Sequence, residues 1–150
     1  MTAGEICNRN VVVAPKTEKI IDAARRMRTS HVGALVVVES RNGRHFPLGI
    51  VTDRDIVVGV VSGDPEHILS VLTGEIMSED LVTAKEDESV EAALKKMEEH
   101  GIRRLPIVDV DGVLLGILTL DDILQYLTTQ QDELVALVVR EQRHERQYRL

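Results

Sequence analysis

An internal repeat restricts the possible folds of this chain more than any other feature of its sequence. When the 150-residue sequence is shifted by 70 positions against itself, Gly4-Glu5-Ile6 falls on Gly74-Glu75-Ile76. Further along, Leu48-Gly49-Ile50 falls on Leu115-Gly116-Ile117 at a shift of 67 positions. The chain therefore contains two copies of one unit, and the drop from 70 to 67 means that the first copy has three extra loop residues.

Each copy predicts the same order of secondary-structure elements. A short strand (residues 11–14 and 81–84) precedes an amphipathic helix, whose apolar residues follow the i, i+3, i+4, i+7 spacing of one helix face. These apolar residues are Ile20, Ala23, Ala24 and Met27 in the first copy and Val90, Ala93, Leu94 and Met97 in the second. The equivalent residues Thr17 and Asp87 suit the N-caps of the two helices.

A hairpin and a second helix follow in each copy. The hairpin strands are expected at residues 35–38 and 48–51, and at 105–108 and 113–118, with turns at Asn42-Gly43 and Asp111-Gly112. The last helices begin near Thr52 and Thr119. Each copy is thus a β-α-β-β-α unit.

The two units are too small to bury much apolar surface alone, so we expect them to share one folded body. The predicted fold is α/β (α+β), with two repeats packed sheet to sheet about a pseudo-twofold axis. The predicted boundaries are repeat 1 at residues 1–61, a linker with a short helix at 62–73, repeat 2 at 74–130 and a C-terminal helical extension at 131–150.

Composition and charge exclude several functional classes. A net charge of −7 opposes general binding to nucleic acid, which is itself a polyanion. The sequence has no apolar run long enough to cross a membrane and no signal peptide at residues 1–5, and Cys7 is the only cysteine. These features predict a cytoplasmic protein without membrane or nucleic-acid partners. The five histidines lack metal-ligand spacing, and no catalytic motif is present, so neither a metal site nor catalysis is expected.

One motif, Gly-Ile-X-Thr-X-X-Asp, recurs in each copy where a strand meets a helix. Its threonine and aspartate are Thr52 and Asp55 in the first copy and Thr119 and Asp122 in the second. Free amides at a helix N-terminus attract phosphate, and an acid in the first turn can accept hydrogen bonds from ribose hydroxyls. The same spacing is also that of a capping box, in which the Thr and the acid satisfy each other's backbone. Spacing alone leaves both interpretations open.

The chain resembles the cystathionine-β-synthase (CBS) domain family, whose domains occur in tandem pairs called Bateman modules. The resemblance covers residues 4 to about 128 and includes both Gly-Ile-X-Thr-X-X-Asp motifs and the segment 101–109, Gly-Ile-Arg-Arg-Leu-Pro-Ile-Val-Asp. It implies a regulatory module without an obligatory cofactor. Such a module binds AMP, ADP, ATP or S-adenosylmethionine between its repeats, often forms homodimers, and signals to a partner protein.

The resemblance also implies roles for individual residues. Thr52, Asp55, Thr119 and Asp122 would contact ribose and phosphate. Residues of the first strands, Val13 and Thr83, would lie against the base, and Arg103 and Arg104 would reach phosphate.

The two copies differ in charge beside the motif acid, where the first has Arg54 and the second has Asp121. Anions should therefore prefer the first copy. In place of Arg103 and Arg104 the first copy has Gly33 and Ala34, which leaves room for a base. We expect one good nucleotide site centred on Thr52, Arg54 and Asp55, and one weaker or empty site.

Beyond the repeats, an apolar pattern continues through Leu134, Leu137 and Val138 and then turns basic at Arg140, Arg143, Arg146 and Arg149. This stretch is either a solvated helical end or a contact with a second subunit or another protein. For the whole chain, the sequence favours a nucleotide-responsive module first, a ligand-free dimerisation or interaction scaffold second, and an enzyme last.

Overall fold

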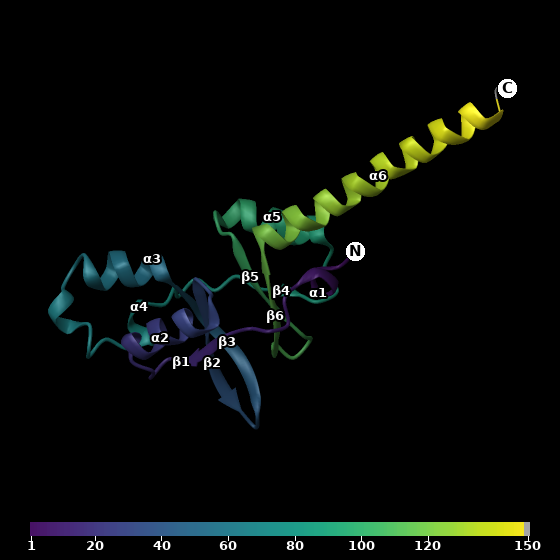
Figure 1. Ribbon diagram of the computed structural model, residues 1–150. Coiled ribbons are helices and arrows are strands. Elements are labelled where there is room, and N and C mark those ends of the chain that lie inside the picture. Colours follow the sequence, from purple (N-terminus) through teal and green to yellow (C-terminus); the bar gives the residue numbers. More distant parts are fainter. Residues whose placement is uncertain (149–150) are drawn as a thin grey trace.

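The computed structural model describes residues 1–148 and arranges them in two three-stranded sheets (Figure 1). Arg149 and Leu150, the end of the predicted extension, lie outside the described residues. The first copy consists of β1 (Val13–Pro15), α2 (Ile20–Ser30), β2 (Ala34–Arg41), β3 (Arg44–Thr52) and α3 (Asp53–Ile56), which continues as the π-helix η1 (Val57–Val61). The second copy consists of β4 (Ala84–Lys85), α5 (Val90–His100), β5 (Arg104–Val108), β6 (Leu114–Thr119) and α6 (Leu120–Tyr148). The predicted β-α-β-β-α order is confirmed in both copies.

Both sheets have the same topology, because each first strand pairs in parallel with the second, and the second pairs antiparallel with the third. A register shift occurs at equivalent places, between Val37 and Val38 and between Ile107 and Val108. At the predicted Asn-Gly turn, Asn42 and Gly43 have φ angles of 53° and 76°, and two consecutive positive φ values are those of a type I′ hairpin turn.

Each copy has its own apolar core between its sheet and its helices. Of the predicted stripes, Ile20, Ala23, Met27 and Val90, Ala93, Met97 are buried in these two cores. Ala24 is only partly buried, and the prediction was wrong for Leu94, which is 39% exposed. The predicted N-caps were wrong, because α2 and α5 begin two residues later, after Lys19 and Ser89. The Ser89 hydroxyl accepts a hydrogen bond from the Ala92 amide at 3.1 Å, so Ser89 and not Asp87 caps α5.

The short lead-in helices α1 (Ala3–Ile6) and α4 (Thr73–Ile76) are exchanged between the copies. The amide of Ala3 donates to the carbonyl of Glu88 at 2.8 Å, and Ala3 is buried in the core of the second copy. The amide of Thr73 donates in turn to the carbonyl of Glu18 in the first copy at 2.9 Å. Each repeat is therefore completed by a segment that precedes the other repeat in sequence.

This exchange explains the glycine of the repeated motif. A Cβ atom on Gly49 would lie 2.5 Å from the carbonyl oxygen of Ser78, and one on Gly116 would lie 2.6 Å from Sγ of Cys7. Atoms of these types do not approach so closely. Only glycine lets the segment after each lead-in helix cross the third strand of the other copy.

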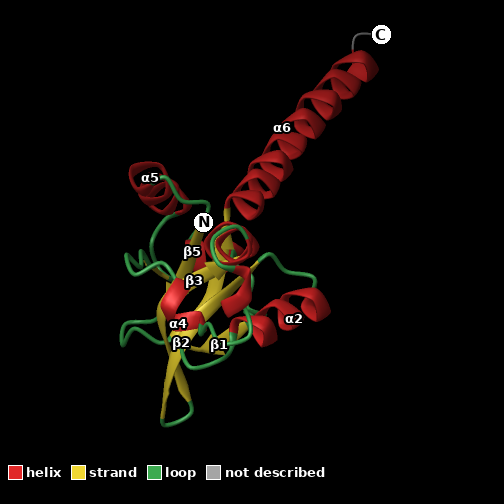
Figure 2. Cartoon of the chain, turned by 90° about the vertical axis from the view of Figure 1, so that its left-hand side faces the viewer, coloured by secondary structure: helices red, strands yellow, loops and turns green. Residues whose placement is uncertain are grey.

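The connection between the repeats contains the 3₁₀-helix η2 (Pro65–His67), which has Pro65 in its first turn and lies within the predicted linker. The last helix, α6, runs without interruption for 29 residues and projects away from the two sheets (Figures 1 and 2). Of the helices within residues 1–148, none combines the length and the apolar character that a membrane crossing requires.

Candidate functional site

Two cavities lie where the copies meet, and each is built from both of them. The first cavity has a volume of about 250 Å³. Its walls are Ile50, Thr52, Asp55, Ser78, Asp80, Leu81, Val82, Ile102, Arg103 and Arg104. The second cavity has a volume of about 340 Å³. Its walls are Asn8, Asn10, Val11, Val12, Val32, Gly33, Ala34, Val36, Arg104, Ile117, Thr119, Asp121 and Asp122. Each cavity thus combines the strand-to-helix corner of one copy with the start of the second strand of the other.

The first cavity brings together four of the predicted site residues: Thr52, Asp55, Arg103 and Arg104. Arg103 and Arg104 come from the second copy, so the basic pair faces the corner of the first copy and not only its own. Arg54 is absent from the walls of both cavities. The structure therefore centres the first cavity on the pair of arginines across the junction, where the sequence had suggested Arg54.

The second cavity holds the other predicted pair, Thr119 and Asp122, and adds Asp121 and Arg104. Arg104 lines both cavities. Among residues 1–148, neither Arg103 nor Arg104 makes a side-chain hydrogen bond or an ion pair, so both guanidinium groups have all their donors available. Free guanidinium groups on a cavity wall are suited to bind phosphate.

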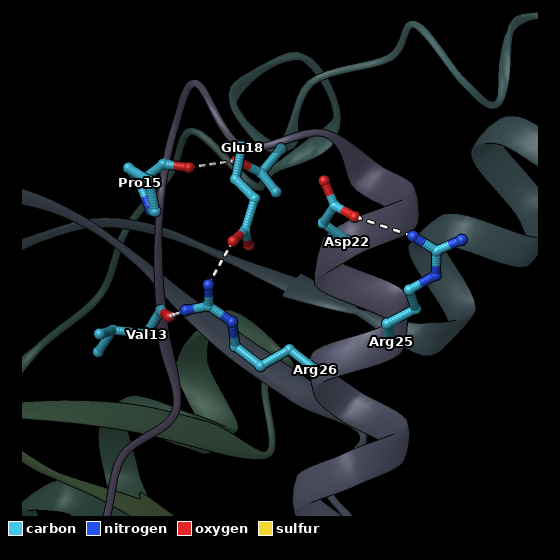
Figure 3. A network of polar contacts seen from close by, with 7 residues as sticks. Val13, Pro15, Glu18, Asp22, Arg25 and Arg26 are labelled. Carbon is cyan, nitrogen blue, oxygen red and sulfur yellow. Dashed lines mark hydrogen bonds and ion pairs between the residues drawn. The ribbon is translucent and has the colours of Figure 1, made fainter.

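Val13 and Thr83 do not line either cavity, although their neighbours Val12 and Val82 do. The carbonyl of Val13 accepts a hydrogen bond from Arg26, and Arg26 also pairs with Glu18 (Figure 3). The carbonyl of Thr83 accepts one from Lys96 Nζ at 3.1 Å. These two backbone positions join the first strand of each copy to its helix.

Sequence reasoning missed several wall residues, chiefly Asp80 in the first cavity and Asn10 in the second. The repeat alignment could have found them, because Asp80 and Asn10 are equivalent at the shift of 70 and directly precede the predicted first strands at residues 81–84 and 11–14.

Both corners form capping boxes, so that interpretation of the motif is confirmed. The Thr52 amide donates to Asp55 Oδ2 at 2.8 Å, and the Asp55 amide donates to Thr52 Oγ1 at 3.1 Å. The second corner repeats both bonds at 2.8 and 3.2 Å. Within residues 1–148, capping uses Oδ2 of each aspartate and leaves Oδ1 without a hydrogen bond. The same carboxylate can therefore cap its helix and accept a hydrogen bond from a ligand.

The expectation that exposed corner amides would hold phosphate was wrong for the first copy. The amide of Asp53 donates to the carbonyl of Gly33 at 3.0 Å, and the amide of Arg54 donates to Asp53 Oδ1 at 2.8 Å. The amide of Asp55 is occupied by Thr52. Because all three amides have partners inside the protein, an anion in the first cavity depends on side chains, and Arg103 and Arg104 are the basic residues of its wall.

The two corners differ in whether the threonine hydroxyl already donates a hydrogen bond inside the protein. The Thr119 hydroxyl donates to Asp122 Oδ2 at 2.8 Å, whereas Thr52 Oγ1 only accepts a bond from its own corner. The Thr52 hydroxyl can therefore donate to a bound group, while that of Thr119 is already in use. The charged residues also differ, since Asp55 and Asp80 balance Arg103 and Arg104 in the first cavity, and Asp121 and Asp122 outnumber Arg104 in the second.

Interlocked α/β repeats with ligand-sized cavities at their junction define a class of small-molecule-binding module. The chain belongs to the CBS domain family, because the family's sequence model, described as "CBS domain", matches residues 3–62 and 73–129. In residues 1–148 there is no group of three or more His, Cys, Asp or Glu side chains placed to hold a metal ion.

Several known proteins are similar to this chain. An uncharacterized protein of Methanopyrus kandleri is 41% identical over 127 residues, which are 83% of this chain and 62% of that protein. Hypoxic response protein 1 of Mycobacterium tuberculosis is 34% identical over 128 residues, 84% of this chain and 85% of that protein. An inosine-5′-monophosphate dehydrogenase of Methanocaldococcus jannaschii is 33% identical, but the match spans only 23% of the enzyme.

Solved structures agree with the fold. The CBS domain pair of protein MJ0100, in complex with 5′-methylthioadenosine and S-adenosyl-L-methionine, has a TM-score of 0.75 and 25% identity, and the match covers 87% of this chain and 98% of that one. A structure of the hypoxic response protein with two coordinated zinc ions has a TM-score of 0.69 and 31% identity, with coverage of 83% and 98%.

Proposed function

We propose that this protein is a non-catalytic sensor that binds an adenine nucleotide, AMP, ADP or ATP, in the first cavity and reports its presence to a partner protein. The observation that carries the proposal is the wall of that cavity. It combines a free carboxylate oxygen on Asp55 and a free hydroxyl proton on Thr52 with the unpaired guanidinium groups of Arg103 and Arg104. These groups complement the sugar hydroxyls and phosphate of a nucleotide.

The apolar part of the wall suits the remaining part of such a ligand. Ile50, Val82 and Ile102 surround the cavity with aliphatic surface, which can pack on both faces of a purine. The two ligands in the MJ0100 domain pair both contain adenosine, and that structure shares this fold. Similarity of fold supports the ligand class, while the arginines support a ligand with phosphate.

The second cavity favours a different ligand. Two carboxylates, Asp121 and Asp122, face one arginine there, so a phosphate would meet net negative charge. S-adenosylmethionine carries a positive sulfonium centre and suits this cavity better than a nucleotide does. We therefore assign nucleotide to the first cavity and keep S-adenosylmethionine as the alternative ligand for the second.

Signal output in this proposal is a change in the relative position of the copies. Each cavity is walled by both copies, so a ligand that contacts Thr52 and Arg103 together favours the arrangement in which they are close. The proposed setting is the cytoplasm, and the proposed assembly is a homodimer that contacts a separate regulated protein.

Calorimetric titration of the full chain with AMP, ATP and S-adenosylmethionine tests the proposal, using Asp55→Asn and Asp122→Asn as a matched pair. Asparagine keeps an oxygen that can accept the capping bond, so both variants should fold and differ from the parent mainly in charge and ligand contact. We expect one AMP per chain, an affinity loss of about tenfold or more in Asp55→Asn, and little change in Asp122→Asn. Equal losses in the two variants would refute the assignment to the first cavity.

A thermal-unfolding panel separates the sensor from the scaffold interpretation. A ligand at one hundred times its Kd stabilises the native state by about 2.7 kcal/mol, which raises the melting temperature by several degrees in a chain of this size. If none of AMP, ADP, ATP and S-adenosylmethionine shifts the melting temperature, the sensor proposal fails and the scaffold interpretation remains.

A further inference from the structure

The outer part of α6 carries a large apolar surface that nothing in the described structure covers. Every residue from Leu127 to Tyr148 is exposed. Leu134, Leu137 and Val138 retain 65%, 62% and 51% of their accessible surface. Both views show this part of the helix extending away from the sheets and the other helices (Figures 1 and 2).

The sequence of this segment is unsuited to a helix that stands alone in water. Residues 134–139 are Leu-Val-Ala-Leu-Val-Val, which is apolar all round the helix, and such helices are normally buried. Three of the six are valine, which has a low intrinsic helix propensity. Helices of this length in proteins depend on packing of an apolar face for their stability. A solvated helical end therefore does not explain residues 134–139.

The spacing of the apolar residues fits packing against another helix. Residues at alternating steps of three and four form one continuous seam along α6, as in a coiled coil. This seam consists of Leu124, Leu127, Gln131, Leu134, Val138, Glu141, Glu145 and Tyr148. Val135 and Leu137 flank it and widen the apolar contact around Leu134 and Val138.

We propose that α6 packs antiparallel against α6 of a second copy of this chain. Charge supports both the occupant and the direction. Residues 120–133 contain four acidic and no basic residues, whereas residues 140–148 contain three arginines and two glutamates. An antiparallel pair places the basic end of each helix beside the acidic part of the other, and a parallel pair would place the two basic ends together.

An antiparallel seam centred on residue 136 also brings apolar residues together at the middle of the pair and near its ends, while Leu127 faces Glu145 and Gln131 faces Glu141. It sets Leu134 opposite Val138 of the second copy and Leu124 opposite Tyr148, so apolar residues meet at the centre and near both ends. Since α6 is 29 residues long, or about 43 Å, the two bodies lie at opposite ends of the pair. Both cavities remain open, and the inference does not depend on ligand binding.

Sedimentation equilibrium of the full chain tests the pairing. Leu134→Glu is the test variant, and Ala136→Glu is its matched control. Both variants add one carboxylate to the same turn, but position 134 lies on the seam and position 136 on the far side of the helix. We expect Leu134→Glu to halve the assembly mass and Ala136→Glu to keep it. An unchanged mass in Leu134→Glu, or a wild-type chain that is monomeric at 100 µM, would overturn the proposal.

Disulfide cross-linking tests the direction in chains that carry Cys7→Ser. Leu124→Cys and Tyr148→Cys should cross-link when the two chains are mixed, because the antiparallel seam brings these positions together. Each chain alone should not cross-link. Cross-linking of Leu124→Cys with itself would show a parallel pair and overturn the antiparallel arrangement, and circular dichroism of each variant confirms that the fold is kept.

Discussion

The two cavities have the same backbone construction and different side chains. In both, a corner with a threonine-aspartate capping box faces the start of the second strand of the other copy. The first cavity has Arg103 and Arg104 where that strand begins, and the second has Gly33 and Ala34 at the equivalent positions. The repeat thus fixes the shape of each site, and a few substitutions set its charge.

The comparison separates residues that both corners need for the fold from residues that only one cavity has. In both corners a helix must be capped and the lead-in segment must pass close to the third strand, so Thr, Asp and Gly occur in both. Arg103 and Arg104 take no part in capping or in the close approach, and they occur once; in the proposed function they bind the anion. A charge difference confined to the walls lets one fold hold two unlike ligands, or one ligand and an empty site.

The largest effect should come from adding a methyl group where the lead-in segments cross the sheets. Gly49→Ala places a Cβ atom 2.5 Å from the carbonyl oxygen of Ser78, and Gly116→Ala places one 2.6 Å from Sγ of Cys7. Each should lower the free energy of unfolding by about 1–3 kcal/mol, measured by urea denaturation. Gly49→Ala should cost more, because its backbone oxygen contact is at 2.5 Å, whereas the Cβ atom of Gly116→Ala meets the movable sulfur of Cys7 first and the backbone oxygen of Asn8 at 2.8 Å.

Gly59→Ala is the matched control, because a Cβ atom there would meet nothing within 4 Å. Alanine also favours helix over glycine, so this change should leave stability unchanged or raise it slightly. If Gly49→Ala and Gly59→Ala had the same effect, the exchanged crossing would not be needed for stability.

Much of the fold could be predicted because the repeat supplied each element twice. The stripes of α2 and α5 and the hairpin turns are local patterns, and the structure confirms them. The exchange of α1 and α4 was not predictable, because these helices have four residues each and their backbone hydrogen-bond partners are 55 to 85 positions away. A pattern shared by two copies does not reveal which copy each segment joins.

The sequence predicted which residues form the site better than it predicted how these residues are arranged. The motif and the resemblance named Thr52, Asp55, Arg103 and Arg104, and the structure brings these four together. They lie together only because the copies face each other across the junction. Arg54 is adjacent to the motif acid in sequence, yet a helix turns successive side chains by about 100°, and Arg54 does not line the cavity.

Each copy also has an ion pair between the turn before its first long helix and that helix: Glu18 with Arg26 (Figure 3), and Glu88 with Lys96. Glu88 Oε1 accepts from Lys96 Nζ at 2.8 Å and from the Lys85 amide at 3.0 Å. Pro15 is equivalent to Lys85 and has no amide hydrogen to donate. Within residues 1–148, Oε2 of Glu18 is accordingly buried without a hydrogen-bond partner.

Because of this difference, the two carboxyl groups should have different pKa values. Burial raises the pKa of Glu18, and the charge of Arg26 only partly opposes it. Burial acts the same way on Glu88, but hydrogen bonds from Lys96 and Lys85 outweigh it and lower the pKa of Glu88. Ionised Glu88 therefore stabilises the fold above its unfolded pKa, and this contribution is lost as pH falls through the folded pKa. Glu18 acts oppositely, and its ionisation lowers stability as pH rises from the unfolded pKa to the folded pKa.

Glu88→Gln should cost about 1.5 kcal/mol at pH 7, and the cost should shrink in acid. Glu18→Gln should cost less at pH 7, since it removes a buried charge. Urea denaturation between pH 3 and 7 measures both, and carboxyl NMR titration measures the pKa values directly. Pro15→Ala supplies the missing amide donor and should lower the pKa of Glu18. An unchanged Glu18 pKa in that variant would show that the proline is not the cause.

The smallest effect should come from the N-caps of the two equivalent helices. Lys19 and Ser89 have similar backbone angles, with φ and ψ of −65° and 140° against −67° and 155°, but only Ser89 caps its helix with a side chain. Lys19→Ser should therefore add about 0.5 kcal/mol, because the hydroxyl can accept from the first turn and a cation is removed from the positive end of the helix dipole. Ser89→Ala should lose about 1 kcal/mol by the same reasoning, and urea denaturation measures both. Lys19→Ala removes the cation without adding a cap, so a gain equal to that of Lys19→Ser would assign the effect to charge and contradict the capping argument.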